Sequence, residues 1–316
     1  PGGARRQLTF FKDRVGGGFY LRGSGAIVYP RDSGGSEFFQ LYRFDPESGE
    51  SALLTDGKSR NTDAAQSNSG KLISYNSTRR NGKDTDFYLA DPKDPKSTRL
   101  LLQVQGGGWE TLDWSPDDKT LLVKEEISVA ESYLHLLDVA SGKRSPLIEQ
   151  KAAKPDPLAM RAADERVAYK QAAFARDGAG VFVTTDRDSE FLRLAYIDLA
   201  SRKHEYLTSD IKWDIDSFDL SRDGKHLCFV ANEDGLGVLH LYDVKARKEL
   251  PRPKVPAAGE AEGSCDGACT AWLLRSWRCR WRVGSPWPTP RARRSPCPTT
   301  MPAIPGARRC CAAGTR

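Results

Sequence analysis

The stretch "FDLSRDGKHLCFV", residues 218–230, decides the fold of this 316-residue chain. An apolar run stops at Ser-Arg-Asp-Gly and resumes as "LCFV". A tight turn between antiparallel strands needs a residue with positive φ, which Gly224 adopts at little steric cost. The run after the turn is short and rich in aromatic and β-branched residues, which favours a strand over a helix. We therefore interpret the stretch as a β-hairpin.

The same turn and apolar run occur four more times, separated by steps of 45, 48, 60 and 46 residues. The turn position holds Gly25, Gly70, Asp118 and Gly178, and the runs that follow are "AIVY", "LISY", "LLVK" and "VFVT". Aspartate tolerates left-handed φ better than most residues, so Asp118 can replace glycine. We expect positive φ at each of these positions.

An aspartate follows each turn at a fixed distance of 19 to 21 residues. These aspartates are Asp45, Asp91, Asp138, Asp198 and Asp243. Each precedes a polar turn and another short strand. Two features in fixed phase across five copies indicate one repeated unit of short antiparallel strands, which is typical of a β-propeller blade. We predict an all-β fold, an incomplete β-propeller with five recognisable blades and an irregular C-terminal tail. A long β-sandwich is the alternative, although a sandwich needs no internal period.

The repeats divide the chain into three parts. We predict an N-terminal lead-in over 1–19, propeller repeats over 20–261 and an anomalous tail over 262–316. The long step of 60 residues contains a polar insertion around 151–170, with short helical character at "LAMRAADERVA". Insertions of this kind map to loops on one face of a repeat fold.

The tail differs in composition from the body. From Glu262 onward there are ten Arg, no Lys and four Trp, so the body carries about −2 and the tail about +8. Arginine interleaved with tryptophan can grip phosphates and stack on bases, and Cys265 and Cys269 could begin a metal site. The cysteines lack a second pair at zinc spacing. The composition matches GC-rich codons read out of frame, so we interpret the tail as out-of-frame sequence and expect no nucleic-acid partner. A genuine disordered tail and a binding arm are the alternatives.

A resemblance enters with three of the repeats. "DWSPDDKTLLV", "FARDGAGVFVTTDRD" and "DLSRDGKHLCFVANEDG" resemble the WD40-like propeller repeats of TolB and of the N-terminal propeller of prolyl-oligopeptidase-type (family S9) serine peptidases. Residues 213–256 are more similar to the peptidases. This resemblance implies a propeller that caps an α/β-hydrolase domain and limits entry to short or unfolded peptides.

No catalytic residue is carried over by that resemblance. The G-x-S-x-G motif of the hydrolase domain is absent, because neither Ser24 nor Ser69 has both glycines. The four histidines lie in or beside strand runs, where we expect packed or solvated side chains and not a general base. They are His135, His204, His226 and His240. Cys228, the one cysteine of the body, is expected to be a small buried hydrophobe. We assign no catalytic, cofactor-binding or metal-binding residue and expect no cofactor.

Three functions are compatible with this sequence. The first is the non-catalytic propeller of a serine peptidase, whose partners are peptide substrates met through a catalytic domain missing from this chain. The second is a TolB-like module that binds proteins. The third is a propeller enzyme with carboxylates in its channel, although acids near blade turns more often bind backbone amides. Its candidates are Asp113, Asp214, Asp216 and Asp219. We expect no membrane partner, and the periplasm and the cytoplasm are both compatible.

Overall fold

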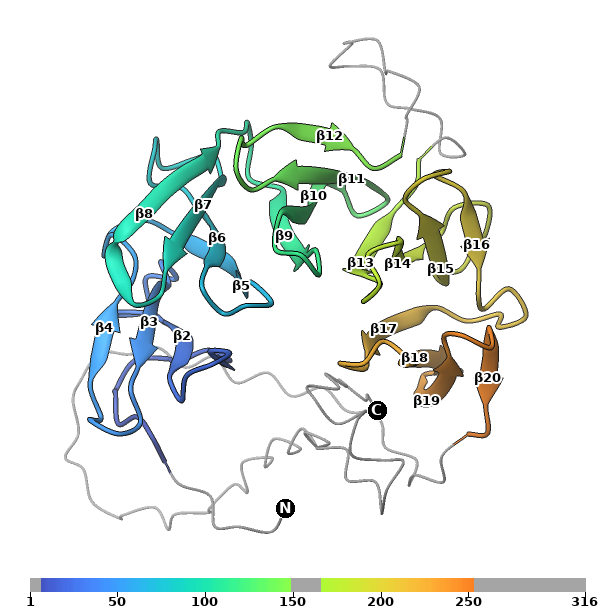
Figure 1. Cartoon of the computed structure of the whole chain (residues 1–316), viewed down its shortest axis with the longest axis horizontal. Helices are drawn as coiled ribbons and strands as arrows, with labels where there is room; N and C mark the ends of the chain where they lie inside the picture. The colour runs from blue at the N-terminus through green and yellow to red at the C-terminus, as the bar shows by residue number, and fades with distance from the viewer. Residues whose placement is uncertain (1–6, 149–165, 253–316) are drawn as a thin grey trace, which may run out of the picture. The chain divides into compact units, whose positions relative to one another are not determined.

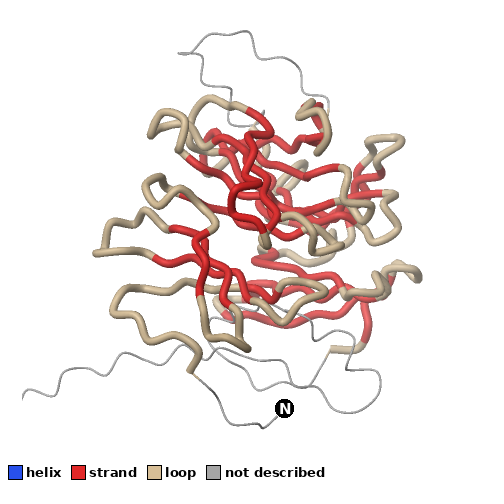
Figure 2. Tube along the Cα trace, turned by 60° about the vertical axis from the view of Figure 1, so that its left-hand side comes forward, coloured by secondary structure: helices blue, strands red, loops and turns tan. Residues whose placement is uncertain are grey.

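The computed structural model describes residues 7–148 and 166–252, which form five four-stranded antiparallel sheets (Figure 1). Within each sheet the strands are neighbours in chain order, so every sheet is a meander of consecutive hairpins. We call the sheets blades 1 to 5 in sequence order. Strands and loops make up the described part of the chain (Figure 2), and it contains no helix with the length and hydrophobicity of a membrane span. The predicted all-β propeller architecture is confirmed.

The strands of each blade have the following bounds. Blade 1 contains β1 (Phe19–Tyr20), β2 (Ile27–Arg31), β3 (Gln40–Phe44) and β4 (Ser51–Leu53). Blade 2 contains β5 (Asn61–Gln66), β6 (Ile73–Ser77), β7 (Asp86–Asp91) and β8 (Asp94–Leu102). Blade 3 contains β9 (Trp109–Trp114), β10 (Thr120–Ser128), β11 (Glu131–Asp138) and β12 (Arg144–Pro146). Blade 4 contains β13 (Tyr169–Phe174), β14 (Gly180–Thr185), β15 (Arg193–Asp198) and β16 (His204–Tyr206). Blade 5 contains β17 (Ile215–Leu220), β18 (His226–Glu233), β19 (Leu236–Asp243) and β20 (Lys248–Leu250).

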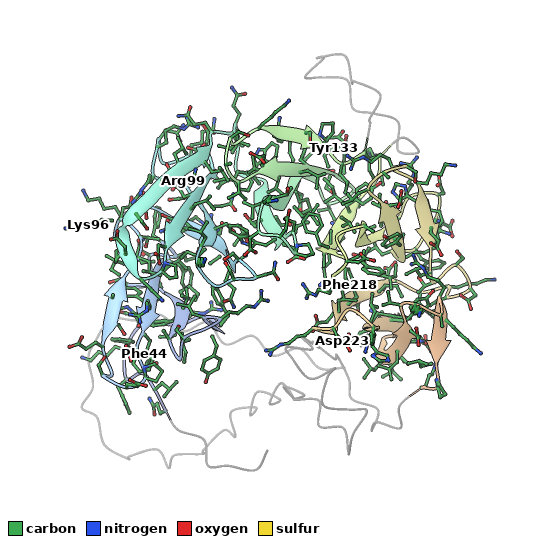
Figure 3. The ribbon with its side chains drawn as sticks, in the orientation of Figure 1. Phe44, Lys96, Arg99, Tyr133, Phe218 and Asp223 are labelled. Atoms are coloured by element: carbon green, nitrogen blue, oxygen red, sulfur yellow. The ribbon has the colours of Figure 1, made fainter. Side chains whose placement is uncertain are left out.

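The repeated turn joins the first and second strands of each blade. In blade 5 the Gly224 amide donates to the Ser221 carbonyl at 2.9 Å, and Gly224 has φ +70°. The Ser221 hydroxyl donates to Asp223, which is labelled in Figure 3, at 2.7 Å. The geometry that recurs among the blades is a turn closed by a residue in the left-handed region, as such hairpin loops require. The same region holds Gly70, Asp118 and Gly178, as predicted.

The prediction for Gly25 is wrong. In blade 1 the residue with positive φ is Gly23, at +72°, and Gly25 is not among the glycines with positive φ. Here the Ser24 amide donates to the Leu21 carbonyl at 3.2 Å, so Gly23 is the third residue of the turn. A turn of type II needs positive φ at that third position. Blade 1 therefore uses a different turn type, in which the glycine with positive φ is Gly23, two positions before Gly25.

The repeated aspartates cap the turn after the third strand. Asp138 accepts hydrogen bonds from the Ser141 amide at 2.7 Å and the Ser141 hydroxyl at 2.6 Å. Asp198 accepts the same two bonds from Ser201, each at 2.7 Å. In both cases these bonds from serine lower the pKa of the aspartate. The side chain thus satisfies backbone donors that the turn would leave unpaired.

The apolar core consists of four clusters, each between two successive blades. Blades 1 and 2 share one cluster, and the pairs 2 and 3, 3 and 4, and 4 and 5 share the others. Trp114 of blade 3 illustrates the packing, since it is 1% exposed and its indole donates to the Ser74 hydroxyl of blade 2 at 3.1 Å. Cys228 is 2% exposed, as expected of a buried hydrophobe. Each cluster therefore takes its residues from two neighbouring blades, so one blade cannot bury its apolar face alone.

The first strands of successive blades lie next to one another. Strands β5, β9, β13 and β17 contact in that order. Between β13 and β17 the Gln171 side-chain amide donates to the Phe218 carbonyl at 2.8 Å and accepts from the Phe218 amide at 2.9 Å. Phe218 is labelled in Figure 3. The Gln171 side chain pairs with both backbone groups of Phe218, as a neighbouring strand would, and so aligns blade 4 with blade 5.

Two of the predicted non-repeat segments overlap or pair with strands of the blades. The lead-in already runs beside β2 before residue 19, because the Asp32 amide donates to the Arg14 carbonyl at 3.1 Å and the Gly16 amide to the Pro30 carbonyl at 2.9 Å. The predicted insertion overlaps β13, which begins at Tyr169. The predicted helical character lies almost wholly outside the described residues, as does the tail over 262–316.

Candidate functional site

A pocket of about 580 Å³ opens at one end of blades 1 to 3. Its walls come from the start of β5, the start of β9, the end of β10 and the loops between β2 and β3 and between β6 and β7. The side chains that give it character are Phe38, Asp63, Glu110, Glu126 and Ile127. Because loops and strand ends from three blades meet here, this is where side chains distant in sequence can act on one ligand.

Asp63 reaches the pocket through an irregularity in β5. The register between β5 and β6 shifts between Thr62 and Ala65, and Asp63 has φ +54°. A bulge of this kind redirects a side chain out of the regular alternation. The residue is exposed to solvent as a whole. Loss of hydration beside the pocket wall nevertheless raises the pKa of the Asp63 carboxyl, a hydrogen bond with Thr62 opposes this, and the charge of Glu110 raises the pKa further.

Lys124 provides a fixed positive charge behind the pocket. Its side chain is 6% exposed, and its ammonium group contacts Glu110 and lies 3.1 Å from Glu126. It also donates to the Lys170 carbonyl of blade 4 at 3.3 Å. Burial alone would lower the pKa of Lys124, but the two glutamates outweigh it and raise the pKa. The lysine therefore stays charged and holds both carboxylates in place.

The rim of the pocket is apolar. Phe38 is 48% exposed and Ile127 is 55% exposed, and Val129, two residues further on, is 80% exposed. Large apolar side chains at the mouth of a polar pocket favour binding of a chain with both apolar and polar groups. The sequence repeat gave no signal for this site, because its residues lie outside the repeated turn and aspartate positions.

The four channel aspartates occupy separate positions. Asp113 accepts a hydrogen bond from the Phe174 amide of blade 4 at 2.9 Å, and burial raises its pKa. Asp214 accepts from the Leu192 amide at 2.8 Å. Asp216 is exposed, yet some loss of hydration, followed by the charge of Asp214, raises its pKa. Asp219 lies on β17. Asp113 and Asp214 thus bind backbone amides, as expected. Within 7–148 and 166–252 no three His, Cys, Asp or Glu residues are placed to hold a metal ion.

The serines and histidines of the sequence analysis lie in turns and strands. Ser24 is in the β1–β2 turn, and the Ser69 amide donates to Asp118 at 2.8 Å. The histidines lie on four strands: His135 on β11, His204 on β16, His226 on β18 and His240 on β19. Cys265 and Cys269 are outside the described residues.

His204 lies in an environment that lowers its pKa. Its Nε2 lies 3.0 Å from the hydroxyl of Tyr169, which lies on β13 of the same blade. Burial, followed by the charge of Arg187, lowers the pKa of His204 to about 4. A histidine held neutral and packed on a tyrosine fits the predicted structural role.

Comparisons with known proteins agree with the β-propeller fold. The family model for the dipeptidyl peptidase IV (DPP IV) N-terminal region matches residues 105–267, just over half of the chain. A search of curated protein sequences gave no match. Solved structures with a similar fold include TolB from Acinetobacter baumannii, with a TM-score of 0.54, 16% identity, and coverage of 78% of this chain and 56% of TolB.

Two other solved structures are similar at lower identity. A puromycin-hydrolyzing peptidase from Mycobacterium tuberculosis has a TM-score of 0.58 and 13% identity, covering 79% of this chain and 40% of that one. An oligogalacturonate lyase in complex with manganese has a TM-score of 0.58 and 11% identity, covering 79% and 67%. Identities this low establish the fold alone. The chain spans about half the length of the TolB and less than half that of the peptidase.

The stacked four-stranded meanders and these matches define a protein of the β-propeller class. Within that class the chain belongs to the family of the dipeptidyl peptidase IV N-terminal region, the propeller region of S9-type peptidases. The match begins just before β9 and continues beyond β20. The resemblance seen in the sequence is therefore confirmed.

Proposed function

We propose that this chain is the non-catalytic propeller portion of a prolyl-oligopeptidase-type serine peptidase and controls the access of peptides to an α/β-hydrolase domain. The observation that carries the proposal is the family match over residues 105–267. The site residues add to it, because within residues 7–148 and 166–252 no serine hydroxyl is hydrogen-bonded to a histidine ring: His204 contacts the Tyr169 hydroxyl and His240 contacts Glu233. The chain's own contribution is then to select and hold peptides.

The pocket on blades 1 to 3 gives this role a location. An extended peptide exposes apolar side chains together with unpaired amides and charged groups. The apolar side chains of the peptide can pack on the rim at Phe38 and Ile127. Its unpaired amides and positively charged groups can donate hydrogen bonds to Asp63, Glu110 and Glu126. A folded protein has these groups buried or paired, so it offers less to the pocket. Selection of short or unfolded peptides follows from that difference.

The first test is the coding DNA after the codon for Val255. Our proposal expects another reading frame there to resume blade repeats and then to encode G-x-S-x-G in a strand–turn–helix context. A frame that ends after one or two more blades contradicts the peptidase proposal. That result favours the second candidate, a TolB-like module that binds proteins, which is supported by the similarity of fold to TolB.

The second test is the substrate preference of the protein with the restored frame. Phe38→Ala and Ile127→Ala remove the apolar rim, whereas Leu53→Ala and Leu100→Ala remove exposed leucines elsewhere on blades 1 and 2. We expect the rim variants to raise KM for peptides of about ten residues by several-fold, with KM for a dipeptide anilide unchanged. Equal effects on both substrates, or equal effects of the leucine variants, would contradict a role of this pocket in peptide selection.

A further inference from the structure

His240 is fully buried inside blade 5 and lies between two carboxylates. Its side chain is 0% exposed, and its ring stacks on Phe229 of β18 with centroids 4.7 Å apart and planes 10° apart. Nδ1 lies 2.7 Å from Glu249 Oε1 on β20, and Nε2 lies 2.9 Å from Glu233 Oε1 on β18. One ring thus connects the end of the β18–β19 hairpin with the edge strand β20.

Arg252 contacts both of these carboxylates. Its guanidinium donates to Glu233 Oε1 at 3.0 Å and to Glu233 Oε2 at 3.3 Å, so both oxygens of Glu233 act as acceptors. Its Nε lies 3.8 Å from Glu249 Oε1. On the side of blade 4, Glu205 is paired with Arg247 at 3.4 Å. The partners of His240 are therefore acceptors on both sides of the ring.

A neutral imidazole cannot satisfy this arrangement. It has one donor nitrogen and one acceptor nitrogen, so one of its lone pairs would face a carboxylate oxygen. Only the imidazolium donates from both nitrogens. Two glutamates, one imidazolium and one guanidinium together have no net charge, and a buried charge is tolerated when it is paired and hydrogen-bonded.

We propose that His240 is held as an imidazolium and forms a proton-dependent clasp between the β18–β19 hairpin, β20 and Arg252. The edge strand β20 pairs with β19 at only three positions, from Lys248 to Leu250. The clasp adds an anchor beside this short pairing, at the point where the chain leaves blade 5. When His240 loses a proton, one carboxylate faces a lone pair, and β20 is released from β19 more readily.

Nuclear magnetic resonance of the whole chain with ¹⁵N-labelled histidine tests the charge directly. The resonances of His240 are assigned by their loss in His240→Gln. At about pH 6 we expect both ring nitrogens to carry protons, and we expect the loss of one proton at higher pH to coincide with faster hydrogen exchange in β20. A neutral tautomer at that acidic pH, or exchange in β20 that ignores the titration, would overturn the proposal.

A pair of glutamate variants tests the clasp. Glu249→Gln replaces the carboxylate with an amide that can donate or accept, so a neutral ring is also satisfied. Glu47→Gln alters an exposed glutamate of blade 1. After correction for intrinsic rates, we expect exchange in β20 to accelerate by about tenfold between about pH 6 and pH 9 in the wild type and in Glu47→Gln, and to stay constant in Glu249→Gln. The same acceleration in Glu249→Gln would overturn the proposal. If that variant does not fold, the histidine spectra of the wild type decide.

Discussion

Gly70 shows how tightly the repeated turn constrains a single residue. It has φ +70°, and a Cβ added there would lie 2.3 Å from the Arg22 carbonyl oxygen of blade 1. Gly178 occupies the same place in blade 4 with φ +73°, but an added Cβ would have no atom within 4 Å. The two positions therefore separate two costs, backbone strain alone and strain combined with a steric overlap between blades.

We predict that Gly70→Ala destabilises the chain far more than Gly178→Ala. The strain of positive φ should cost about 1 to 2 kcal/mol in each variant. The overlap with the Arg22 carbonyl should add about 2 kcal/mol at Gly70, because backbone of blade 1 must move. Urea unfolding followed by tryptophan fluorescence measures both. Equal shifts of the unfolding midpoint would show that the contact between blades adapts without cost.

Asp118 has a role that its glycine counterparts lack. Its carboxylate accepts from the Asn68 amide at 2.5 Å and from the Ser69 amide at 2.8 Å, both in the turn of blade 2. Burial alone would raise the pKa of Asp118, but the bonds from Ser69 and Asn68 outweigh it and lower the pKa. The departure from glycine in the third repeat is thus explained by a bond between two blades.

We predict that Asp118→Gly destabilises the chain although it restores the commoner residue. Glycine relieves positive φ, but the loss of two charge-assisted hydrogen bonds should leave a net cost of about 1 to 2 kcal/mol. Asp234→Gly is the matched control, since Asp234 has φ +53° in the β18–β19 hairpin. We expect that control to be neutral or slightly stabilising by urea unfolding. A stabilised Asp118→Gly would contradict the bridging role.

At the scale of elements, β16 carries a histidine whose pKa is lowered by its surroundings. His204 on this strand has its pKa lowered from 6.5 to about 4, first by burial and then by Arg187. The unfolded chain takes up a proton on this residue below about pH 6.5, whereas the folded chain does not until about pH 4. The folded state therefore loses stability as the pH falls through this window, and this residue adds no further loss below it.

We predict that His204→Gln reduces the loss of stability between pH 7 and pH 4.5. Glutamine cannot titrate, so the part of the acid sensitivity that comes from His204 disappears. Urea unfolding of wild type and variant at both pH values measures the difference. His226→Gln is the control, because that histidine is at the start of β18 and only partly buried. An unchanged pH dependence in His204→Gln would show that the folded state accepts the proton.

The elements also show which features a sequence can predict. The strands beside Gly224 and the capped turn at Asp138 were predictable, because each depends on residues within a few positions of it. The pocket was not, since Asp63 enters it through a bulge and Lys124 is fixed by Glu110 and by the carbonyl of Lys170 in the next blade. Such contacts depend on how strands and blades pair, which no local pattern encodes.

At the scale of the molecule, burial is distributed unevenly among the blades. Within the described residues, blades 2, 3 and 4 each contribute to two apolar clusters, whereas blades 1 and 5 each contribute to one. In a fold made of repeats, stability is close to a sum of terms for each unit and each interface between neighbours. The two outer blades therefore have fewer stabilising interfaces than the three inner ones.

We predict that blades 1 and 5 unfold before blades 2, 3 and 4. Native-state hydrogen exchange should protect β6, β10 and β14 more than β2 and β18, since local opening follows the number of buried contacts. Uniform protection across the five second strands, with one sharp melting transition, would contradict this. It would mean that the single interface of each outer blade stabilises it as much as the two interfaces stabilise an inner blade.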